Sequence, residues 1–531
     1  MKTATTILAC LLLGIVLLAP SAMGATGPEA WMRVPIDGLA AVALVLALPH
    51  RARRRGAIAA GVALGLLTVA KILGLGFSAV LDRPFEPLAD WEFLGSAVDV
   101  LERSIGEAGA VAVAVGAVLL MLALAVLVTL SFMRVAGLLA GLPVPRRAAT
   151  AWGVGGLVLV WAVCLATGAQ LVAGVPVAAH DLYDQARQVG DGLLDPKRFA
   201  AESAADPFRD VPGQDLLKAL RGKDVIIAFV ESYGRVSVED PQLSPRIRAT
   251  LEAGTERLRQ KGFGSRSAYL TSPTAGGGSW LAHCTLLSGL WVNNQQRYKQ
   301  LLASDRLTLS GAFGRAGWRT VGFMPGNTMA WPEGQRFYGF DRIYAADDVG
   351  YQGSKFAFDS IPDQYSLSAL QRAERVGGDR APVMATIPLL SSHAPWDPVP
   401  RLVDWSDVGD GSGFDNGGAA DLSADVFSRD RTRVRTDYRD AIDYTLESLV
   451  SYVETYGDDD LVLVFLGDHQ PAPIIAGRGA GRDVPITIVA HDPAVLGRVS
   501  GWGWNEGLMP GPGAPVWRMD AFRDRFLTAF R

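Results

Sequence analysis

The stretch Leu461–Pro471, LVLVFLGDHQP, places an unbroken apolar run directly before an aspartate–histidine pair. A short apolar run of this kind is typical of a strand buried on both faces of a parallel sheet. Two other stretches have the same form: Val225–Val230 runs into Glu231, and Val383–Leu389 runs into a loop that contains His393. Ligands bind beyond the carboxyl ends of strands in open α/β sheets. These stretches therefore predict a functional site at one edge of a sheet.

The residues around these stretches extend the α/β pattern. Further strands are expected at Thr320–Met324 and Val484–Val489, and helices at Trp280–Leu287 and Asp437–Tyr456. Strands that alternate with helices predict a mostly parallel central sheet covered on both faces. We expect this α/β domain to occupy residues 224–531.

The N-terminal third has a different composition. The chain has 531 residues, 49% of them hydrophobic, and a mean hydropathy of +0.20, which is too apolar for an ordinary soluble protein of this size. A helix needs roughly 20 apolar residues to cross a membrane. We therefore predict a membrane region over residues 1–176 with about five transmembrane helices. The apolar stretches are Thr6–Pro20, Val34–Pro49, Gly56–Leu81, Gly109–Phe132 and Trp152–Val175.

The distribution of arginine predicts the orientation of these helices. Residues 51–55, RARRR, and the loop with Arg134, Arg146 and Arg147 are basic, whereas the loop near Asp82–Glu107 is acidic. Basic loops stay in the cytoplasm. We expect a multi-pass protein of the cytoplasmic membrane, a connector at 177–223 and an extracytoplasmic catalytic domain. The first apolar stretch is either a retained helix or a cleavable signal peptide, and the orientation is the same in both cases.

Charge and cysteine content exclude several classes of function. The formal net charge is −4 and no basic stripe is present, so we expect no nucleic-acid partner. Three cysteines without paired spacing support neither a disulfide framework nor a thiolate zinc site.

The residues at the predicted sheet edge suit a divalent cation. Asp468 and His469, with Glu231 from another strand, offer oxygen and imidazole ligands. A cation there could polarise a phosphoryl oxygen and lower the pKa of a nearby hydroxyl. The segment 272–280, SPTAGGGSW, supplies that hydroxyl on a glycine-rich turn before a helix, with Ser279 as the candidate nucleophile and Thr274 as its rival. As a metal-bound alkoxide, Ser279 would be a fourth metal ligand beside Glu231, Asp468 and His469.

These motifs resemble the alkaline-phosphatase/sulfatase superfamily. Residues 279–289, SWLAHCTLLSG, are similar to the superfamily segment that begins at the nucleophile, which places Ser279 there. Glu231, Asp468 and His469 match the metal ligands of the lipoteichoic acid synthase branch, and His393 matches its substrate-side histidine. The resemblance implies an enzyme that handles phosphate esters with one divalent metal ion, manganese being expected and magnesium or zinc the alternatives.

The chain departs from the family at two places. Sulfatases that convert a cysteine or serine to formylglycine carry proline and arginine where this chain has Leu281 and His283, which favours an unmodified serine and phosphoryl chemistry. His283 either faces the site as a substrate-binding residue or packs below it. Trp331 resembles a substrate-pocket tryptophan, but the arginine expected two residues later is Glu333. Trp331 is therefore either a pocket or a core residue.

Three functions remain open from the sequence. The first is the transfer of a phosphate-linked alcohol headgroup from a membrane phospholipid to a cell-envelope glycan or lipid, through a phosphoester on Ser279 with His393 as the general acid. The second is a membrane-tethered phosphodiesterase or sulfatase in which water is the acceptor. The third is a non-enzymatic membrane scaffold that retains the fold.

Overall fold

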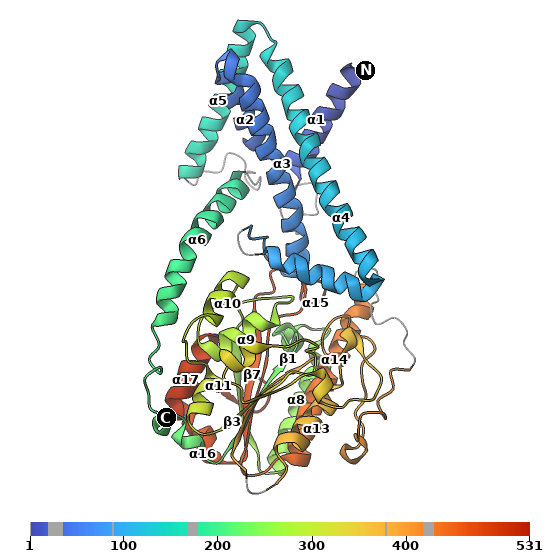
Figure 1. Cartoon of the computed structure of the whole chain (residues 1–531), viewed down its shortest axis with the longest axis vertical. Coiled ribbons are helices and arrows are strands. Elements are labelled where there is room, and N and C mark those ends of the chain that lie inside the picture. The colour runs from blue at the N-terminus through green and yellow to red at the C-terminus, as the bar shows by residue number, and fades with distance from the viewer. Residues whose placement is uncertain (1, 20–35, 88–89, 168–178, 378–379, 418–428) are drawn as a thin grey trace. The chain divides into compact units, whose positions relative to one another are not determined.

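The computed structural model describes residues 2–19, 36–87, 90–167, 179–377, 380–417 and 429–531 (Figure 1). The chain divides into two compact units. The first contains residues 1–79 and 83–195, and the second contains residues 80–82 and 196–531. The predicted limits at 176 and 223 are not tested by this division and stay a prediction.

The first unit is helical, with a helix over the described part of each apolar stretch. Among the described residues, two segments are long and apolar enough to cross a membrane: His50–Val80, with 31 residues, and Ile105–Ala140, with 36. Only 6% of the most apolar part of Ile105–Ala140 is buried, whereas a helix in the core of a soluble protein is mostly buried. The number of spans and their orientation stay predictions. The helices are α1 (Lys2–Leu18), α2 (Ile36–Ala47), α3 (His50–Val80), α4 (Trp91–Ala140) and α5 (Val144–Thr167).

Two glycines allow α3 and α4 to approach closely. A Cβ atom at Gly65 would lie 2.8 Å from the carbonyl oxygen of Ala125, and one at Gly61 would lie 3.1 Å from Thr129. Small residues four apart favour this kind of contact between apolar helices. The helix α4 itself contains a break at Gly106, whose φ is 76°.

The second unit is built on one mixed sheet. Its strand order is β4-β3-β5-β1-β6-β7-β2-β8, and β9 also pairs with β2. The first five run parallel, and β7 runs antiparallel to both β6 and β2, so β2 points the same way as β6. The strands are β1 (Asp224–Val230), β2 (Gly264–Thr271), β3 (Arg319–Phe323), β4 (Arg342–Tyr344), β5 (Val383–Leu389), β6 (Leu461–Gly467), β7 (Asp483–Ala490), β8 (Asn505–Glu506) and β9 (Val516–Arg518).

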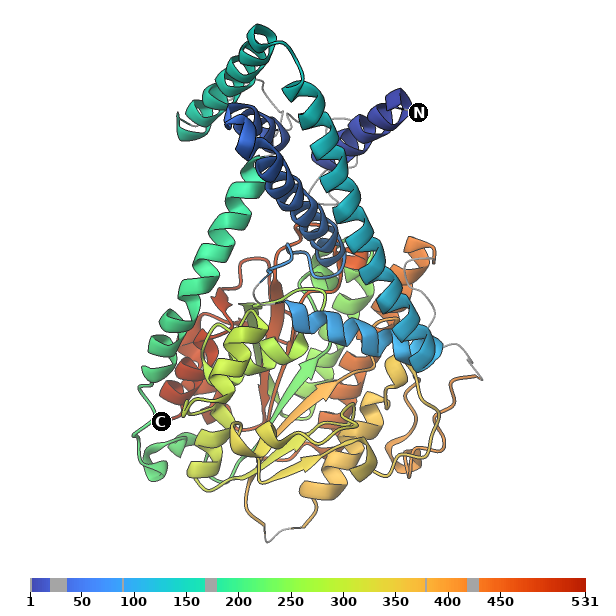
Figure 2. The ribbon, with the colours of Figure 1, turned by 45° about the horizontal axis from the view of Figure 1, so that its top comes forward.

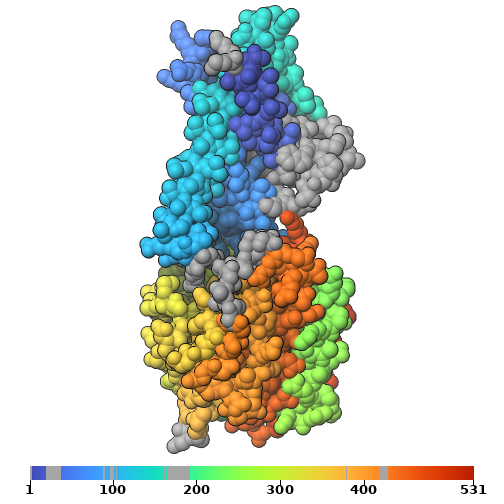
Figure 3. Space-filling view, turned by 90° about the vertical axis from the view of Figure 1, so that its right-hand side faces the viewer, coloured from blue at the N-terminus to red at the C-terminus, as the bar shows by residue number. Residues whose placement is uncertain are grey.

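Helices cover both faces of this sheet, which confirms the predicted α/β architecture (Figure 2). In Figure 1, α8, α13 and α14 lie on one side and α9, α11 and α17 on the other. Every residue of β1 and β6 is buried, as their continuous apolar sequences require. The space-filling view shows α14 in orange beside α8 in green on the surface of this unit (Figure 3).

The helices of the second unit range from one turn to seven turns. The two long ones, α8 and α14, pack against each other. The helices are α7 (Val236–Glu239), α8 (Ser244–Gln260), α9 (Ser279–Ser288), α10 (Gln295–Leu302), α11 (Leu309–Arg315), α12 (Pro332–Arg336), α13 (Asp363–Glu374), α14 (Arg431–Tyr456), α15 (Pro473–Ala476), α16 (Pro493–Arg498) and α17 (Ala521–Ala529).

A helix forms the first part of the predicted connector. This helix, α6, runs from Ala179 to Ala204 and contains Pro196. A proline inside a helix removes one backbone hydrogen bond and adds a steric clash. Gln300 Nε2 donates to the carbonyl oxygen of Pro196 at 2.7 Å, which anchors the helix at this residue without replacing the lost bond.

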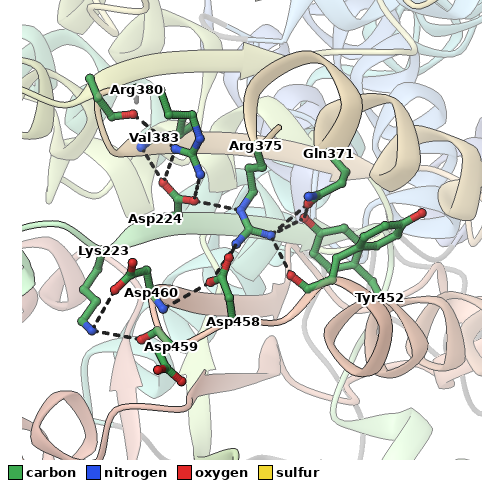
Figure 4. A network of polar contacts seen from close by, with 12 residues as sticks. Lys223, Asp224, Gln371, Arg375, Arg380, Val383, Tyr452, Asp458, Asp459 and Asp460 are labelled. Carbon is green, nitrogen blue, oxygen red and sulfur yellow. Dashed lines mark hydrogen bonds and ion pairs between the residues drawn. The ribbon is translucent and has the colours of Figure 1, made fainter. Parts of the chain in front are cut away.

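A buried charge network lies at the amino end of β1, opposite the predicted site (Figure 4). Asp224, which is 2% exposed, accepts hydrogen bonds from Arg375 Nε at 2.9 Å, from the Val383 amide at 2.9 Å and from Arg380. Arg375 also contacts the Asp458 carboxylate at 3.0 Å. The network therefore joins the start of two central strands to the ends of α13 and α14.

Loss of the Asp224 charge is expected to destabilise the second unit strongly. Asp224→Asn leaves the buried Arg375 with only the largely exposed carboxylate of Asp458, which costs about 3–5 kcal/mol of unfolding free energy. The matched control is Asp460→Asn, because Asp460 pairs with Lys223 at 3.2 Å but its side chain is 61% exposed. That change should cost under about 1 kcal/mol. Chemical denaturation followed by near-ultraviolet circular dichroism compares the two, and equal small losses would show that the network adds no net stability.

Candidate functional site

The predicted site residues follow strands that end at one edge of the sheet. Strands β1, β5 and β6 are neighbours and parallel, so Glu231, His393 and Asp468 all emerge from their carboxyl ends. Strand β2 points the same way and ends at Thr271, from where the chain leads to Ser279 at the start of α9. The topology therefore brings four separate segments to one edge.

Three of these residues form a compact group of potential metal ligands. Glu231, Asp468 and His469 each offer one ligand atom, and these atoms all lie within 4.8 Å of one another. His469 Nε2 lies 3.3 Å from Glu231 Oε1 and 3.7 Å from Asp468 Oδ2. Each side chain is buried, with exposures of 5%, 1% and 1%.

The Ser279 hydroxyl lies within this group. Its Oγ donates to Glu231 Oε2 at 2.9 Å and lies 3.2 Å from His469 Nε2. The serine is partly exposed, whereas the ligands beneath it are buried. A nucleophile in contact with both a buried carboxylate and an imidazole has the arrangement that activates a hydroxyl.

One carboxylate oxygen in the group has no partner. Asp468 Oδ1 accepts from the amides of Ser232 and His469 at 2.8 and 2.7 Å. Asp468 Oδ2 is buried and has no hydrogen bond within the described residues. A buried oxygen without a donor is costly, and a cation between it, Glu231 and His469 would satisfy it. Two carboxylates and one imidazole suit Zn or Mn, with room for a substrate oxygen.

Backbone groups fix the orientation of His469. Its Nδ1 lies 2.9 Å from the Gln470 carbonyl oxygen, which leaves Nε2 as the nitrogen that faces the group. The same carbonyl oxygen accepts a hydrogen bond from the Gly276 amide at 2.8 Å. This contact ties the loop that carries Ser279 to the residue after His469. One carbonyl thus holds both the nucleophile loop and the imidazole.

Burial and mutual charge shift the pKa values of the three ligands. Burial acts to raise the pKa of Glu231, but the charge of His469 outweighs it and holds that pKa well below its usual range. Burial and the Glu231 charge raise the pKa of Asp468 to about 8. Burial acts to lower the pKa of His469, but Asp468 and Glu231 raise it to about 9. Without a bound cation, Asp468 and His469 therefore hold protons at neutral pH.

Glycines shape the loop that presents Ser279. Gly276, Gly277 and Gly278 have φ values of 71°, 156° and 79°, which side chains rarely adopt. Ser279 is the first residue of α9, whose free amides favour an incoming anion. Thr274, whose hydroxyl is the rival candidate, is buried, and this hydroxyl donates to the Gly277 carbonyl. This hydrogen bond stabilises the loop, whereas the Ser279 hydroxyl contacts Glu231 and His469.

His393 lies in the loop after β5 and is partly buried. Its Nδ1 lies 2.7 Å from the Ala394 carbonyl oxygen, and its ring stacks on Phe358 with centroids 3.7 Å apart. The positive charge of a protonated His393 is close enough to Glu231 to add to the effect of His469 and lower the pKa of that carboxyl. The ring is therefore beside the ligand group without being part of it.

The two remaining candidates occupy different places. The His283 ring lies 4.0 Å from that of Phe229 on β1, and its Nε2 is buried without a hydrogen bond in the described structure. Burial lowers its pKa to about 4, and the charge of Glu231 acts against this shift. Trp331 packs against Tyr338 and Phe340, with ring centroids 5.1 and 6.2 Å apart. The aromatic rings that contact His283 and Trp331 are those of Phe229, Tyr338 and Phe340, and none of these three residues belongs to the group of Glu231, Asp468 and His469.

Several residues that hold the site gave no signal in the sequence. Ser232 has a φ of 59° and directs its amide to Asp468, while its Oγ donates to Glu231 Oε1 at 3.0 Å. Tyr438 of α14 donates to the Ser232 carbonyl at 2.8 Å. Ser392 Oγ donates to the Glu231 carbonyl at 2.7 Å. These contacts depend on chain segments far apart in sequence, and no local motif marks them.

Comparison with known proteins finds a family model that matches part of this unit. The family model described as sulfatase matches residues 237–481, which include Ser279, His393, Asp468 and His469. Glu231 lies just before the matched segment. No curated protein sequence matches the chain.

Several solved structures are similar to this chain at low sequence identity. Lipoteichoic acid synthase LtaP from Listeria monocytogenes is 16% identical over 51% of this chain and 66% of that one, with a TM-score of 0.35. Lipooligosaccharide phosphoethanolamine transferase A from Neisseria meningitidis is 12% identical over 60% and 91%, with a TM-score of 0.38. Phosphoglycerol transferase GacH from Streptococcus pyogenes is 14% identical over 63% and 91%, with a TM-score of 0.36.

The chain spans just under two thirds of the length of LtaP, and 62% of an alkaline phosphatase superfamily protein from Vibrio parahaemolyticus. Identities and TM-scores this low establish no substrate for this chain. The family match concerns the segment that contains the nucleophile loop and two of the three ligands. The segment 237–481 is therefore similar to the sulfatase family, in line with the resemblance of its sequence motifs.

Proposed function

We propose that this chain is a membrane enzyme that transfers a phosphate-linked alcohol headgroup from a phospholipid to an extracytoplasmic glycan or lipid. The observation that carries the proposal is the position of the Ser279 hydroxyl, 2.9 Å from Glu231 Oε2 and 3.2 Å from His469 Nε2. A hydroxyl held in this way is suited to form a phosphoester. The apolar N-terminal helices explain why the donor would be a lipid.

The first step forms a bond between Ser279 Oγ and the phosphorus of the donor, and breaks the bond from phosphorus to the lipid alcohol. Glu231 is ionised because the pKa of that carboxyl is low, and it accepts the Ser279 proton. His393 gives a proton to the departing lipid alcohol. A divalent cation held by Glu231, Asp468 and His469 would neutralise the charge that develops on the phosphoryl oxygens.

The second step reverses the roles with a new alcohol. An acceptor hydroxyl loses its proton to His393 and attacks the phosphorus. The bond from phosphorus to Ser279 Oγ breaks, and Ser279 takes back the proton held by Glu231. The headgroup and its phosphate are then joined to the acceptor. The free amides at the start of α9 favour the anionic phosphoester in both steps.

Hydrolysis is the second candidate function, favoured by the match to a sulfatase model. Water would replace the acceptor hydroxyl, and the same residues would act. Leu281 and His283 stand where formylglycine-forming sulfatases have proline and arginine. We therefore propose an unmodified serine and a phosphate ester as the substrate in both cases.

The two functions differ in the product that carries the headgroup. The purified full-length chain is incubated with manganese and vesicles whose phospholipid headgroups are radiolabelled, with and without cell-envelope glycan. We expect label on a Ser279-containing peptide after rapid quenching, and later on the glycan. Free labelled headgroup phosphate in place of labelled glycan would indicate hydrolysis. An unlabelled peptide with every phospholipid supplied would contradict both and favour a scaffold.

A further inference from the structure

The ring of Phe358 covers one face of the His393 imidazole. The two ring centroids lie 3.7 Å apart and the planes differ by 20°. His393 Nδ1 lies 2.7 Å from the Ala394 carbonyl oxygen, so this nitrogen is already engaged within the protein. With one face covered and one nitrogen bound, Nε2 is the atom that His393 can offer to a substrate.

Phe358 reaches this position through a strained turn. Phe358 and Asp359 have consecutive φ values of 59° and 51°, a conformation that bulky side chains rarely adopt. The turn is closed by a hydrogen bond from the Phe356 amide to the Ser360 carbonyl at 3.1 Å. Strain of this kind persists at functional sites where the surrounding structure enforces it.

Hydrogen bonds join the segment after Phe358 to the segment before His393. Asp363, which begins α13 a few residues after Phe358, is 1% exposed. Its amide donates to Ser391 Oγ at 3.0 Å, and its Oδ1 accepts from the Ser391 amide at 3.1 Å. Its Oδ2 accepts from Thr445 of α14 at 2.6 Å. Two reciprocal bonds therefore fix the Phe358 turn against the loop that carries His393.

We infer that Phe358 is a positioning residue for proton transfer: it holds the His393 ring so that Nε2 meets the leaving alcohol. This inference rests on the proposed function. The argument is geometric, because a proton donor must lie within hydrogen-bond reach of the departing oxygen. An imidazole free to rotate would spend only part of its time in that orientation, and the proton-transfer step alone would slow.

The test compares two substrates that differ in their need for a proton. The p-nitrophenolate ion leaves readily without one, whereas phenolate leaves poorly. The full-length chain with manganese is assayed on methyl p-nitrophenyl phosphate and on methyl phenyl phosphate. We expect Phe358→Ala to slow the first-turnover release of phenol about 10-fold, with less than about a twofold change in the first-turnover release of p-nitrophenol. First-turnover release reports the first step alone, because the second step acts on the same phosphoester whichever ester was supplied. KM should change little on either substrate.

Three variants separate positioning from a general structural effect. Phe358→Tyr keeps the aromatic face and should restore the rate on the phenyl ester. Asp359→Asn changes the exposed neighbouring side chain of the same turn to another type that tolerates a positive φ, and should leave both rates unchanged. Phe358→Gly relieves the backbone strain, so it should lower the rate as Phe358→Ala does while retaining more of the melting temperature.

A double variant gives the decisive outcome. In a His393→Ala background, Phe358→Ala should cause no further loss, because the residue that it positions is gone. Equal losses on the two esters, or a full additional loss in the double variant, would overturn the inference. If Ser279→Ala and metal removal leave the p-nitrophenyl ester turnover intact, the proposed function fails, and this result is distinct from a failure of Phe358.

Discussion

Ser279→Ala is expected to lose at least about 10³-fold in turnover of any substrate, because the phosphoester can no longer form. The hydroxyl makes the two contacts on which its proposed role as the nucleophile rests, at 2.9 Å from Glu231 and 3.2 Å from His469. Removal of one hydroxyl should leave these two side chains able to bind manganese. Turnover measured together with manganese titration tests both parts of this expectation.

Two further variants sharpen this result. Ser279→Thr keeps a hydroxyl at the same atom and should retain a measurable part of the turnover. Thr274→Val removes the hydroxyl of the rival nucleophile without changing its shape, and should cause only a small loss. The Thr274 hydroxyl donates to the Gly277 carbonyl, so its removal affects the loop rather than the reacting group.

The opposite pattern would reassign the nucleophile. Full turnover in Ser279→Ala with a large loss in Thr274→Val would place the covalent bond on Thr274 and make its hydrogen bond to Gly277 a resting-state contact. Loss of manganese binding together with turnover in Ser279→Ala would leave the covalent role unproved. In that case, the radiolabelling experiment on the Ser279-containing peptide would show whether Ser279 forms the covalent bond.

The strands that carry the ligands could be predicted because they are buried on both faces. Apolar residues make up most of β1, β5 and β6, and polar residues come directly after β1 and β6 and one residue after β5, which marks the edge of the sheet. The α/β architecture followed from these runs. The direction of β7 did not, because an apolar run looks the same in a parallel and in an antiparallel strand.

Strand β2 was not predicted, although it leads directly to the nucleophile loop. Its sequence, GSRSAYLT, mixes polar and apolar residues, and only four of its eight residues are buried. The strand is stabilised instead by its partners, since it pairs with β7, β8 and β9. Such long-range pairing leaves no periodic signal in the sequence.

Side-chain chemistry marked the candidate site, but not its support. Glu231, Asp468, His469 and Ser279 are residue types with few structural reasons to follow apolar strands. By contrast, the conformations of Ser232 and Phe358 are backbone features that side-chain types alone do not disclose. Long-range packing determines such features, so a single sequence cannot predict them.

The affinity of the site for manganese is expected to rise steeply with pH. Without a cation, the pKa of Asp468 is raised to about 8 by burial and by the Glu231 charge. Burial acts to lower the pKa of His469, but the charges of Asp468 and Glu231 raise it to about 9. Below these values the two groups hold protons that an incoming cation must displace, and binding therefore releases protons.

The sign and size of this effect follow from the number of protons displaced. Each proton displaced lowers the affinity about 10-fold for every pH unit below the corresponding pKa. Because Asp468 and His469 titrate as an interacting pair, the slope should lie between one and two below pH 8. It should fall towards zero above pH 9. Glu231 adds nothing to the slope, because its pKa is well below the usual range.

Calorimetric titration of manganese into the chelator-treated chain at several pH values measures this slope, and buffers of different ionisation enthalpy count the released protons. Asp468→Asn is the informative variant, because an amide carries no titrating proton, so the slope should fall by about one while the affinity drops. An affinity that does not change between pH 6 and pH 9 would mean that the three side chains bind no cation together. The unpaired Asp468 Oδ2 would then need another partner, and the arrangement of Glu231 and His469 around Ser279 would have to activate the hydroxyl without a metal.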